Sequence, residues 1–382
     1  MLKITKNVFV LLLLIFCGSN LIAQPLLKQK QANGPRFAGI EVGSKGVKMT
    51  LIAREKSRSK DDNYQVLKDT SVNTDFISFS SSSYNATLQA LTSLYQKALN
   101  DFDVPAKRIF TVVSSGVKVQ AAKDNKSDWI TKLASEFKAA ISESDRKVVV
   151  VDVIDEAKLS HLGIVPEERR NTTFLIDIGS GNTKGGYFNG SNTSDFKLFQ
   201  LTWGTKSVSN AAEKRSGDDL TIQNFDKNVN RVVLGEANTE IVYAVNVSNA
   251  YNMSDYVAFS GGIAWATATL LSPELADNPV VPVTYDDVVN FRAALIKNYA
   301  MFSDSRIVNT LSNLAEDEKT TIGGNVKTVN KVFDQKAMLA GTALLLNIMR
   351  QFEGVYEKKQ FFLVKNGQVG WISAYVNQSI GK

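Results

Sequence analysis

Apolar runs and amphipathic segments alternate along the chain. Residues 147–153 and 256–259 are largely apolar, which is typical of strands buried on both faces of a parallel sheet. Within 84–100 and 129–141, apolar residues recur at helical spacing and predict amphipathic helices. Because strands alternate with helices, the pattern favours an α/β fold over a sandwich or a helical bundle.

The remaining elements follow the same plan. The sequence predicts strands at 108–113 and 197–202, a helix over 284–299 that Thr284 and Asp287 cap, a buried helix at 338–349, and a closing pair of strands at 361–364 and 369–375.

Two predicted strand–turn–strand segments each carry one acidic residue just before a glycine turn. Residues 37–54 contain Glu41, and residues 174–188 contain Asp177. Removing an unpaired carboxylate from water is costly, so an acid within a buried strand indicates metal or phosphate chemistry. The turn glycines let backbone N–H groups approach an anion closely.

The two segments repeat one pattern at one constant offset. In each, the acid, an apolar residue, Gly and Ser are followed by a lysine, which is Lys48 in the first segment and Lys184 in the second. A repeat of this length is the size of a domain and predicts two related halves that each begin with a phosphate-binding hairpin. The alternative is two unrelated hairpins that share a Gly-Ser pair.

The first 23 residues have the layout of a secretory signal peptide. Lys3 and Lys6 precede an uncharged run at 8–17, and Ala23 is a suitable small residue before the cut. The run is shorter than the roughly 20 residues that a membrane span needs. We therefore expect cleavage near Ala23, a polar leader over 24–36, and a periplasmic or secreted protein. Lipidation at Cys17 is the alternative.

Composition excludes several kinds of active site. Cleavage near Ala23 removes the single cysteine, and with it any thiol nucleophile, cysteine metal site or disulfide. His161 is the single histidine, which excludes a multi-histidine metal centre, and we expect it to be a partly buried packing residue. The formal net charge of +6 suits an anionic ligand without requiring nucleic acid.

Three further groups of polar residues follow predicted strands. They are the loop 114–118, Glu156, and the pair Gly261 and Gly262. Open α/β sheets bind ligands at the carboxyl ends of their strands, and helix N-termini attract anions. Read alone, Glu156 is explained at least as well as a first-turn glutamate that complements the helix dipole.

Taken in chain order, the first hairpin, the 114–118 loop, the Glu156 segment and the second hairpin resemble the motifs of the exopolyphosphatase and guanosine pentaphosphate phosphohydrolase family. This family belongs to the larger fold of actin, sugar kinases and heat-shock chaperone ATPases. The resemblance covers about 37–266. It implies two related actin-like (ribonuclease H-like) α/β domains, 37–164 and 165–382, with a ligand cleft between them. It also allows C-terminal helices and strands of the second domain to pack back on the first.

The resemblance implies hydrolysis of a phosphoanhydride. Glu156 would be the catalytic base that activates a water, and Asp177 would be catalytic and, with Glu41, would bind Mg²⁺. The phosphate-binding residues would be Gly43, Ser44, Lys48, Ser115, Lys118, Gly179, Ser180, Gly181, Asn182, Thr183, Lys184, Gly261 and Gly262.

Four positions depart from the family pattern. Glu41 stands where the family has aspartate, Lys45 where it has asparagine, and Lys118 where it has arginine. Lys184 stands where the family has a glutamate that helps to bind the metal, and an ammonium cannot ligate Mg²⁺. Either Lys184 contacts phosphate in place of the metal, or the protein binds without turnover.

The lysines among these residues all add positive charge to the predicted cleft. Lys45, Lys48, Lys118 and Lys184 would together raise the positive potential of the cleft and attract a polyanion. The alternative is that Lys48 and Lys184 are the solvent-facing ends of their hairpins.

Three functions remain open on the sequence alone. The first is an exported exopolyphosphatase-type hydrolase, the second a secreted phosphate- or polyanion-binding protein with lost or weak catalysis, and the third an actin-like or sugar-kinase-like ATP-binding protein. We expect an anionic phosphate-containing partner, no nucleic acid and no stable membrane insertion after cleavage. A homodimer is an open alternative.

Overall fold

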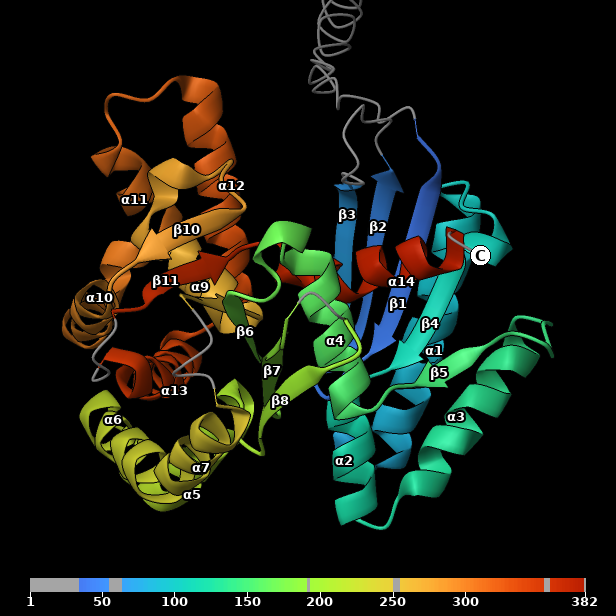
Figure 1. Cartoon of the computed structure of the whole chain (residues 1–382), viewed down its shortest axis with the longest axis horizontal. Helices are drawn as coiled ribbons and strands as arrows, with labels where there is room; N and C mark the ends of the chain where they lie inside the picture. The colour runs from blue at the N-terminus through green and yellow to red at the C-terminus, as the bar shows by residue number, and fades with distance from the viewer. Residues whose placement is uncertain (1–33, 55–63, 191–192, 250–254, 354–357, 381–382) are drawn as a thin grey trace, which may run out of the picture.

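The computed structural model describes residues 34–54, 64–190, 193–249, 255–353 and 358–380. The predicted signal peptide and all but the end of the leader lie outside these ranges. Within them, no helix has the length and apolar character needed to cross a bilayer. Figure 1 shows two α/β bodies, each built on one sheet, with helix α4 between them.

The first sheet has five strands in the order β3-β2-β1-β4-β5. Strands β1, β2 and β3 are antiparallel neighbours, and β4 and β5 run parallel to β1. Their bounds are β1 Arg36–Val42, β2 Gly46–Arg54, β3 Tyr64–Asn73, β4 Ile109–Val113 and β5 Val148–Val150.

The second sheet repeats this plan and adds one strand, in the order β10-β11-β9-β6-β7-β8. Strand β6 takes the place of β1, with β7 and β8 antiparallel on one side and β9 and β11 parallel on the other. The bounds are β6 Thr173–Ile178, β7 Thr183–Phe188, β8 Phe196–Leu201, β9 Tyr256–Ser260, β10 Val280–Val283 and β11 Gln360–Val364. The predicted repeat is therefore confirmed.

Helices cover both faces of the first sheet. Alternate β1 residues such as Ile40 face α1, α2 and α3, where Leu91 and Phe137 complete one core. The bounds are α1 Ser81–Asn100, α2 Ser115–Lys123 and α3 Ser127–Ala140, so the helices predicted at 84–100 and 129–141 are confirmed. A capping box between Ser80 and Ser83 begins α1.

The prediction of a strand over 147–153 that is buried on both faces is wrong. Strand β5 has three residues and is the edge of its sheet, so Val150 is 38% exposed. Helix α4 (Val153–Ile164) begins directly after it. The apolar run continues past this short edge strand through Val151, which is buried, into Val153 and Ile154 at the start of α4, so the run is longer than the strand it contains.

The other face of the first sheet is covered by the end of the chain. The predicted strand at 369–375 is wrong, because these residues belong mainly to helix α14 (Gly370–Ile380). Trp371, Ile372 and Val376 recur at helical spacing and pack against β1, β2 and β4 through residues such as Phe37. Figure 1 shows α14, in red, lying across this sheet.

Helix α4 covers one face of the second sheet and also contacts α14. A Cβ at Gly163 of α4 would lie 1.7 Å from the Gly370 carbonyl oxygen of α14, so only glycine permits this approach. His161 faces the second sheet between the rings of Phe188 and Phe196. It is completely buried, rather than partly buried as expected, because α4 lies between the two sheets.

Nine helical segments of more than four residues, counting only the described residues, lie on the other face of the second sheet and contribute to its main core. They are α5 Thr205–Ser216, α6 Ile222–Arg231, the π-helical turn η4 Val232–Ala237, α7 Asn238–Ser248, α9 Gly262–Leu271, α10 Tyr285–Lys297, α11 Asp304–Thr310, α12 Glu316–Val332 and α13 Gln335–Glu353. The cap of Thr284 and Asp287 on α10 and the burial of 338–349 are confirmed.

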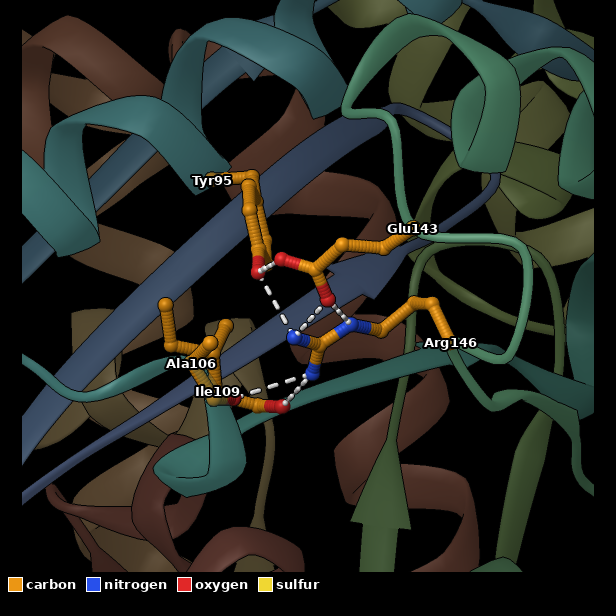
Figure 2. A network of polar contacts seen from close by, with 5 residues as sticks. All are labelled: Tyr95, Ala106, Ile109, Glu143 and Arg146. Atoms are coloured by element: carbon orange, nitrogen blue, oxygen red, sulfur yellow. Dashed lines mark hydrogen bonds and ion pairs between the residues drawn. The ribbon is translucent and has the colours of Figure 1, made fainter.

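A partly buried polar network fixes the loop between α3 and β5 (Figure 2). The Arg146 guanidinium donates to the carbonyl oxygens of Ala106 and Ile109 at 3.0 and 2.9 Å, to the Tyr95 hydroxyl at 2.6 Å, and to Glu143. These bonds occupy all five donors of the guanidinium, so Arg146 joins three segments of the first domain.

Candidate functional site

The two glycine hairpins predicted from sequence meet each other in the structure. A Cβ at Gly181 would lie 3.2 Å from the Ser44 hydroxyl oxygen, and one at Gly116 would lie 3.3 Å from the same oxygen. Gly116 is at the start of α2, and the same Cβ would lie 3.2 Å from Asn182 Oδ1. The first hairpin, the loop at 114–116 and the second hairpin therefore converge at one place.

A buried ion cluster lies beside this convergence. The Lys184 ammonium is 2.9 Å from Asp177 Oδ2 and 3.0 Å from Glu156 Oε1. Lys184 is only 4% exposed and Glu156 8%. Asp177 and Lys184 come from adjacent strands of the second sheet, whereas Glu156 comes from the first turn of α4. We call these three residues the Lys184 triplet.

The charge of Lys184 is maintained by its two partners. Burial alone would lower the pKa of the ammonium, but the Asp177 and Glu156 carboxylates outweigh it and raise the pKa above its ordinary value. Lys184 is therefore a cation at any physiological pH.

The second oxygen of each carboxylate also has a donor. Glu156 Oε2 accepts a hydrogen bond of 2.8 Å from the Ser115 N–H at the start of α2. Asp177 Oδ1 accepts one of 3.3 Å from the Ser260 hydroxyl. The Ser115 hydroxyl is buried without a hydrogen-bond partner, so a donor remains available at the same helix N-terminus.

Glu41 joins the cluster electrostatically. Burial raises the pKa of its carboxyl, Lys48 and Lys184 oppose this rise, and the Glu156 and Asp177 carboxylates add to it. Glu41 is paired in register with Lys48, as Asp177 is with Lys184. Three acids thus share one region with one buried ammonium.

The ligand set does not match a divalent ion. Asp177 and Glu41 are the predicted Mg²⁺ ligands, but both Asp177 oxygens have protein donors, and the ammonium lies where an ion bridging Asp177 and Glu156 would lie. No group of three acidic, histidine or cysteine side chains suited to a metal is found within the described ranges.

The second hairpin rests on the start of α5. The Thr205 and Lys206 N–H groups, at the start of α5, donate to the carbonyl oxygens of Gly179 and Ser180 at 2.9 and 2.7 Å. The Thr183 hydroxyl donates to the Trp203 carbonyl at 2.7 Å. No acceptor among the described residues bonds the N–H groups of 180–182. Such a turn is suited to binding an anion.

The two predicted glycines at the start of α9 have different surroundings. Gly261 has φ of 91°, and a Cβ there would lie 2.7 Å from Asp177 Oδ1, so this glycine is required beside the triplet. Gly262 lies against the Phe333 ring instead. The structure therefore brings Gly261 to the site, whereas Gly262 packs on its far side.

The other predicted lysines lie at the surface. Lys118 forms an exposed ion pair with Asp152, and Lys48 is exposed near Glu41. Burial lowers the pKa of Lys45, and the neighbouring Lys206 and Lys48 ammonium groups lower it further. Lys45, Lys48 and Lys206 thus form a basic rim at the site.

Sequence reasoning missed Lys206 as a member of this rim. Its Nζ also contacts Asp75 Oδ1 at 2.7 Å. The signal was its position immediately after the Trp203-Gly204 turn, where the second hairpin rests on α5.

Two cavities lie away from the site. One of about 680 Å³ adjoins the Arg146 network and is lined by Phe110, Lys147 and Tyr375 among others. The other, of about 130 Å³, is lined by residues such as Trp265 and Lys365. Neither contains a member of the Lys184 triplet.

Comparison with solved structures identifies the architecture. No protein-family model and no curated protein sequence matches the chain. The Ppx/GppA family member from Aquifex aeolicus matches with a TM-score of 0.57 at 15% identity, over 90% of this chain and 98% of that one. An exopolyphosphatase from Cytophaga hutchinsonii matches with a TM-score of 0.56 at 13% identity, over 89% and 98%. The fold is that of Ppx/GppA phosphatases.

This fold has the two actin-like domains predicted from sequence. In this structure the two hairpins, the 114–116 loop and the start of α4 lie next to one another. Its similarity to exopolyphosphatases is one of fold, because the identities are 13% and 15%.

Proposed function

We propose that the protein binds the end of linear polyphosphate, or of a related phosphate-containing polyanion, at the Lys184 triplet, with weak or no hydrolysis. The observation that carries this proposal is the Lys184 ammonium between Glu156 and Asp177, at 3.0 and 2.9 Å. A catalytic base must offer an acceptor to the attacking water. Here each oxygen of Glu156 already accepts from one protein donor, so an attacking water would share the carboxylate with Lys184 and the Ser115 N–H.

Several features supply affinity for phosphate oxygens. The N–H groups of 180–182 have no described acceptor, the Ser115 hydroxyl is buried without a partner, and the basic rim adds charge at the entrance. Charge-assisted hydrogen bonds are stronger than neutral ones. Together these groups favour a multiply charged anion over a neutral ligand.

Hydrolysis is the second candidate. The Glu156 side chain reaches Lys184 and lies at the start of α4, at the junction of both hairpins. If a bound phosphate attracted the Lys184 ammonium, one Glu156 oxygen would become available to a water. This supports a slow exopolyphosphatase-type hydrolase built on the same residues.

The test uses the mature chain, residues 24–382, with long-chain polyphosphate. Binding is measured by calorimetry and phosphate release by a colorimetric assay, for the wild type and Glu156→Gln. Binding without release supports the binding protein, whereas release that Glu156→Gln abolishes supports the hydrolase. Binding of ATP but not polyphosphate would contradict both and favour an actin-like nucleotide-binding protein.

Export is part of the same proposal. The basic start, the uncharged run and Ala23 support cleavage and a periplasmic or secreted location. Mass measurement of the protein purified from its own cells should give a chain that begins at Gln24. An intact N-terminus would contradict this part of the proposal.

A further inference from the structure

Lys184 lies where two acids would otherwise need a cation. Asp177 Oδ2 and Glu156 Oε1 both contact its ammonium, and Glu41 is close enough for the same charges to shift its pKa. Removing an ionised carboxylate from water without a partner is costly. The ammonium therefore offsets a repulsion among the three acids.

The lysine is built into the sheet and does not lie at its surface. All six residues of β7 are buried, and the Lys184 side chain is 6% exposed. A Cβ at Gly179 would lie 3.9 Å from Lys184 Nζ. The ammonium thus lies directly beside the turn whose 180–182 N–H groups are available to an anion.

We infer that Lys184 is the resident cation of this site: it takes the place of a divalent ion between Glu156 and Asp177, and the site binds metal-free phosphate chains. An ammonium and a divalent ion cannot occupy the same position, so Mg²⁺ binding would require Lys184 to leave. The identity of the ligand rests on the proposed function. The exclusion of Mg²⁺ by Lys184 does not depend on the identity of the ligand.

The inference also defines the form of the ligand. Polyphosphate in solution exists as the free anion and as Mg²⁺ complexes. A site that keeps its own cation gains nothing from the complexed form, because the complexed ion meets an ammonium of like charge. Added Mg²⁺ should therefore weaken binding to the wild-type protein by removing the free anion.

The first experiment needs no phosphate ligand. Mg²⁺ is titrated into the mature wild type, Lys184→Glu and Lys184→Met, with heat of binding and thermal unfolding as readouts. We expect no heat and no rise in Tm for the wild type. Both variants should gain Tm on addition of Mg²⁺, since binding to the folded state alone stabilises it. Lys184→Met covers the case in which Lys184→Glu does not fold.

The matched control is Lys197→Met. Lys197 lies on the neighbouring strand β8 and contacts Asp195 at 3.0 Å at the surface, so this change removes one charge from the same sheet without touching the triplet. It should not respond to Mg²⁺. A Mg²⁺-dependent rise in Tm of the wild type, absent in Glu156→Gln, would overturn the inference.

The second experiment measures polyphosphate binding in EDTA and in Mg²⁺. The wild type should bind in EDTA, and Lys184→Glu should bind about tenfold more weakly or worse, as expected for the loss of one charge-assisted contact. Restoration of Lys184→Glu binding by Mg²⁺ would support the replacement. Wild-type binding that requires Mg²⁺ overturns the inference, whereas absence of binding under both conditions overturns the proposed function alone.

Discussion

Lys48 and Lys184 occupy equivalent positions in the two hairpins, opposite Glu41 and Asp177, yet Lys48 is exposed and Lys184 is 4% exposed. Glu156 of α4 contacts the Lys184 ammonium at 3.0 Å, and all six residues of β7 are buried. One repeat of the fold therefore carries a surface lysine and the other a buried one.

Replacing Lys184 by methionine should destabilise the protein by about 3 kcal/mol, because it leaves the buried Glu156 carboxylate and the partly buried Asp177 carboxylate without their cation. Urea unfolding at pH 7 measures the change, with Lys197→Met as a control that should shift stability by less than about 0.5 kcal/mol. Equal effects of the two variants would show that the triplet contributes no more than a surface ion pair.

Replacing Arg146 by methionine should cost about 3 kcal/mol, because Glu143 and two carbonyl groups lose their donor. Arg146→Lys keeps the charge but not the planar fork, so it should restore only part of the loss. Full recovery with lysine would mean that charge alone matters here. Chemical denaturation of the three proteins gives the comparison.

His161 should make stability fall in mild acid. Its Nε2 lies 3.0 Å from the Thr173 carbonyl oxygen, and burial lowers its pKa to about 4. A histidine in the unfolded chain titrates near pH 6.5, so from about pH 6.5 down to about pH 4 the unfolded state binds the extra proton. The free energy of unfolding should then fall by up to about 1.4 kcal/mol per pH unit.

The His161→Gln variant tests this pH dependence. Its amide can still donate to Thr173, but it does not titrate. Unfolding at pH 7, 6 and 5 should show a shallower decline than in the wild type. The same decline in both proteins would assign the effect to other groups.

Gly163→Ala should separate α4 from α14, because the new methyl group would overlap the Gly370 carbonyl oxygen. We expect a loss of about 2 kcal/mol or more, as for other overpacked sites. Gly324→Ala is the control: it lies in α12 with no atom within 4 Å of the added carbon, and it should be neutral or slightly stabilising. Thermal unfolding distinguishes the two, and similar Tm values would contradict the close crossing.

The sequence pattern was sufficient to predict the repeat and most of the strands and helices near it. The acid, glycine turn and lysine of each hairpin are local signals, and they predicted β1, β2, β6 and β7 within a residue or two. These signals placed Asp177 and Lys184 in the candidate site, whereas Glu156 was added to it by the family resemblance, and the roles of all three stay predictions.

The sequence pattern did not predict features that depend on which helix or strand packs against a segment. Residues 369–375 alternate enough to suggest a strand, and only the apolar face of β1, β2 and β4 explains why they form a helix. The burial of Lys184 likewise depends on Glu156, which reaches it from α4. Pattern alone left it open whether Lys184 faced solvent.

The position of α14 has a consequence for biosynthesis. Its 11 residues are the last described helix of the chain, yet they cover the sheet that the ribosome produces first. Until they emerge, Phe37, Ile52 and Val112 lack their cover, so the first half cannot complete its core as an independent unit during synthesis. The first half therefore completes its core only after α14 has been synthesised.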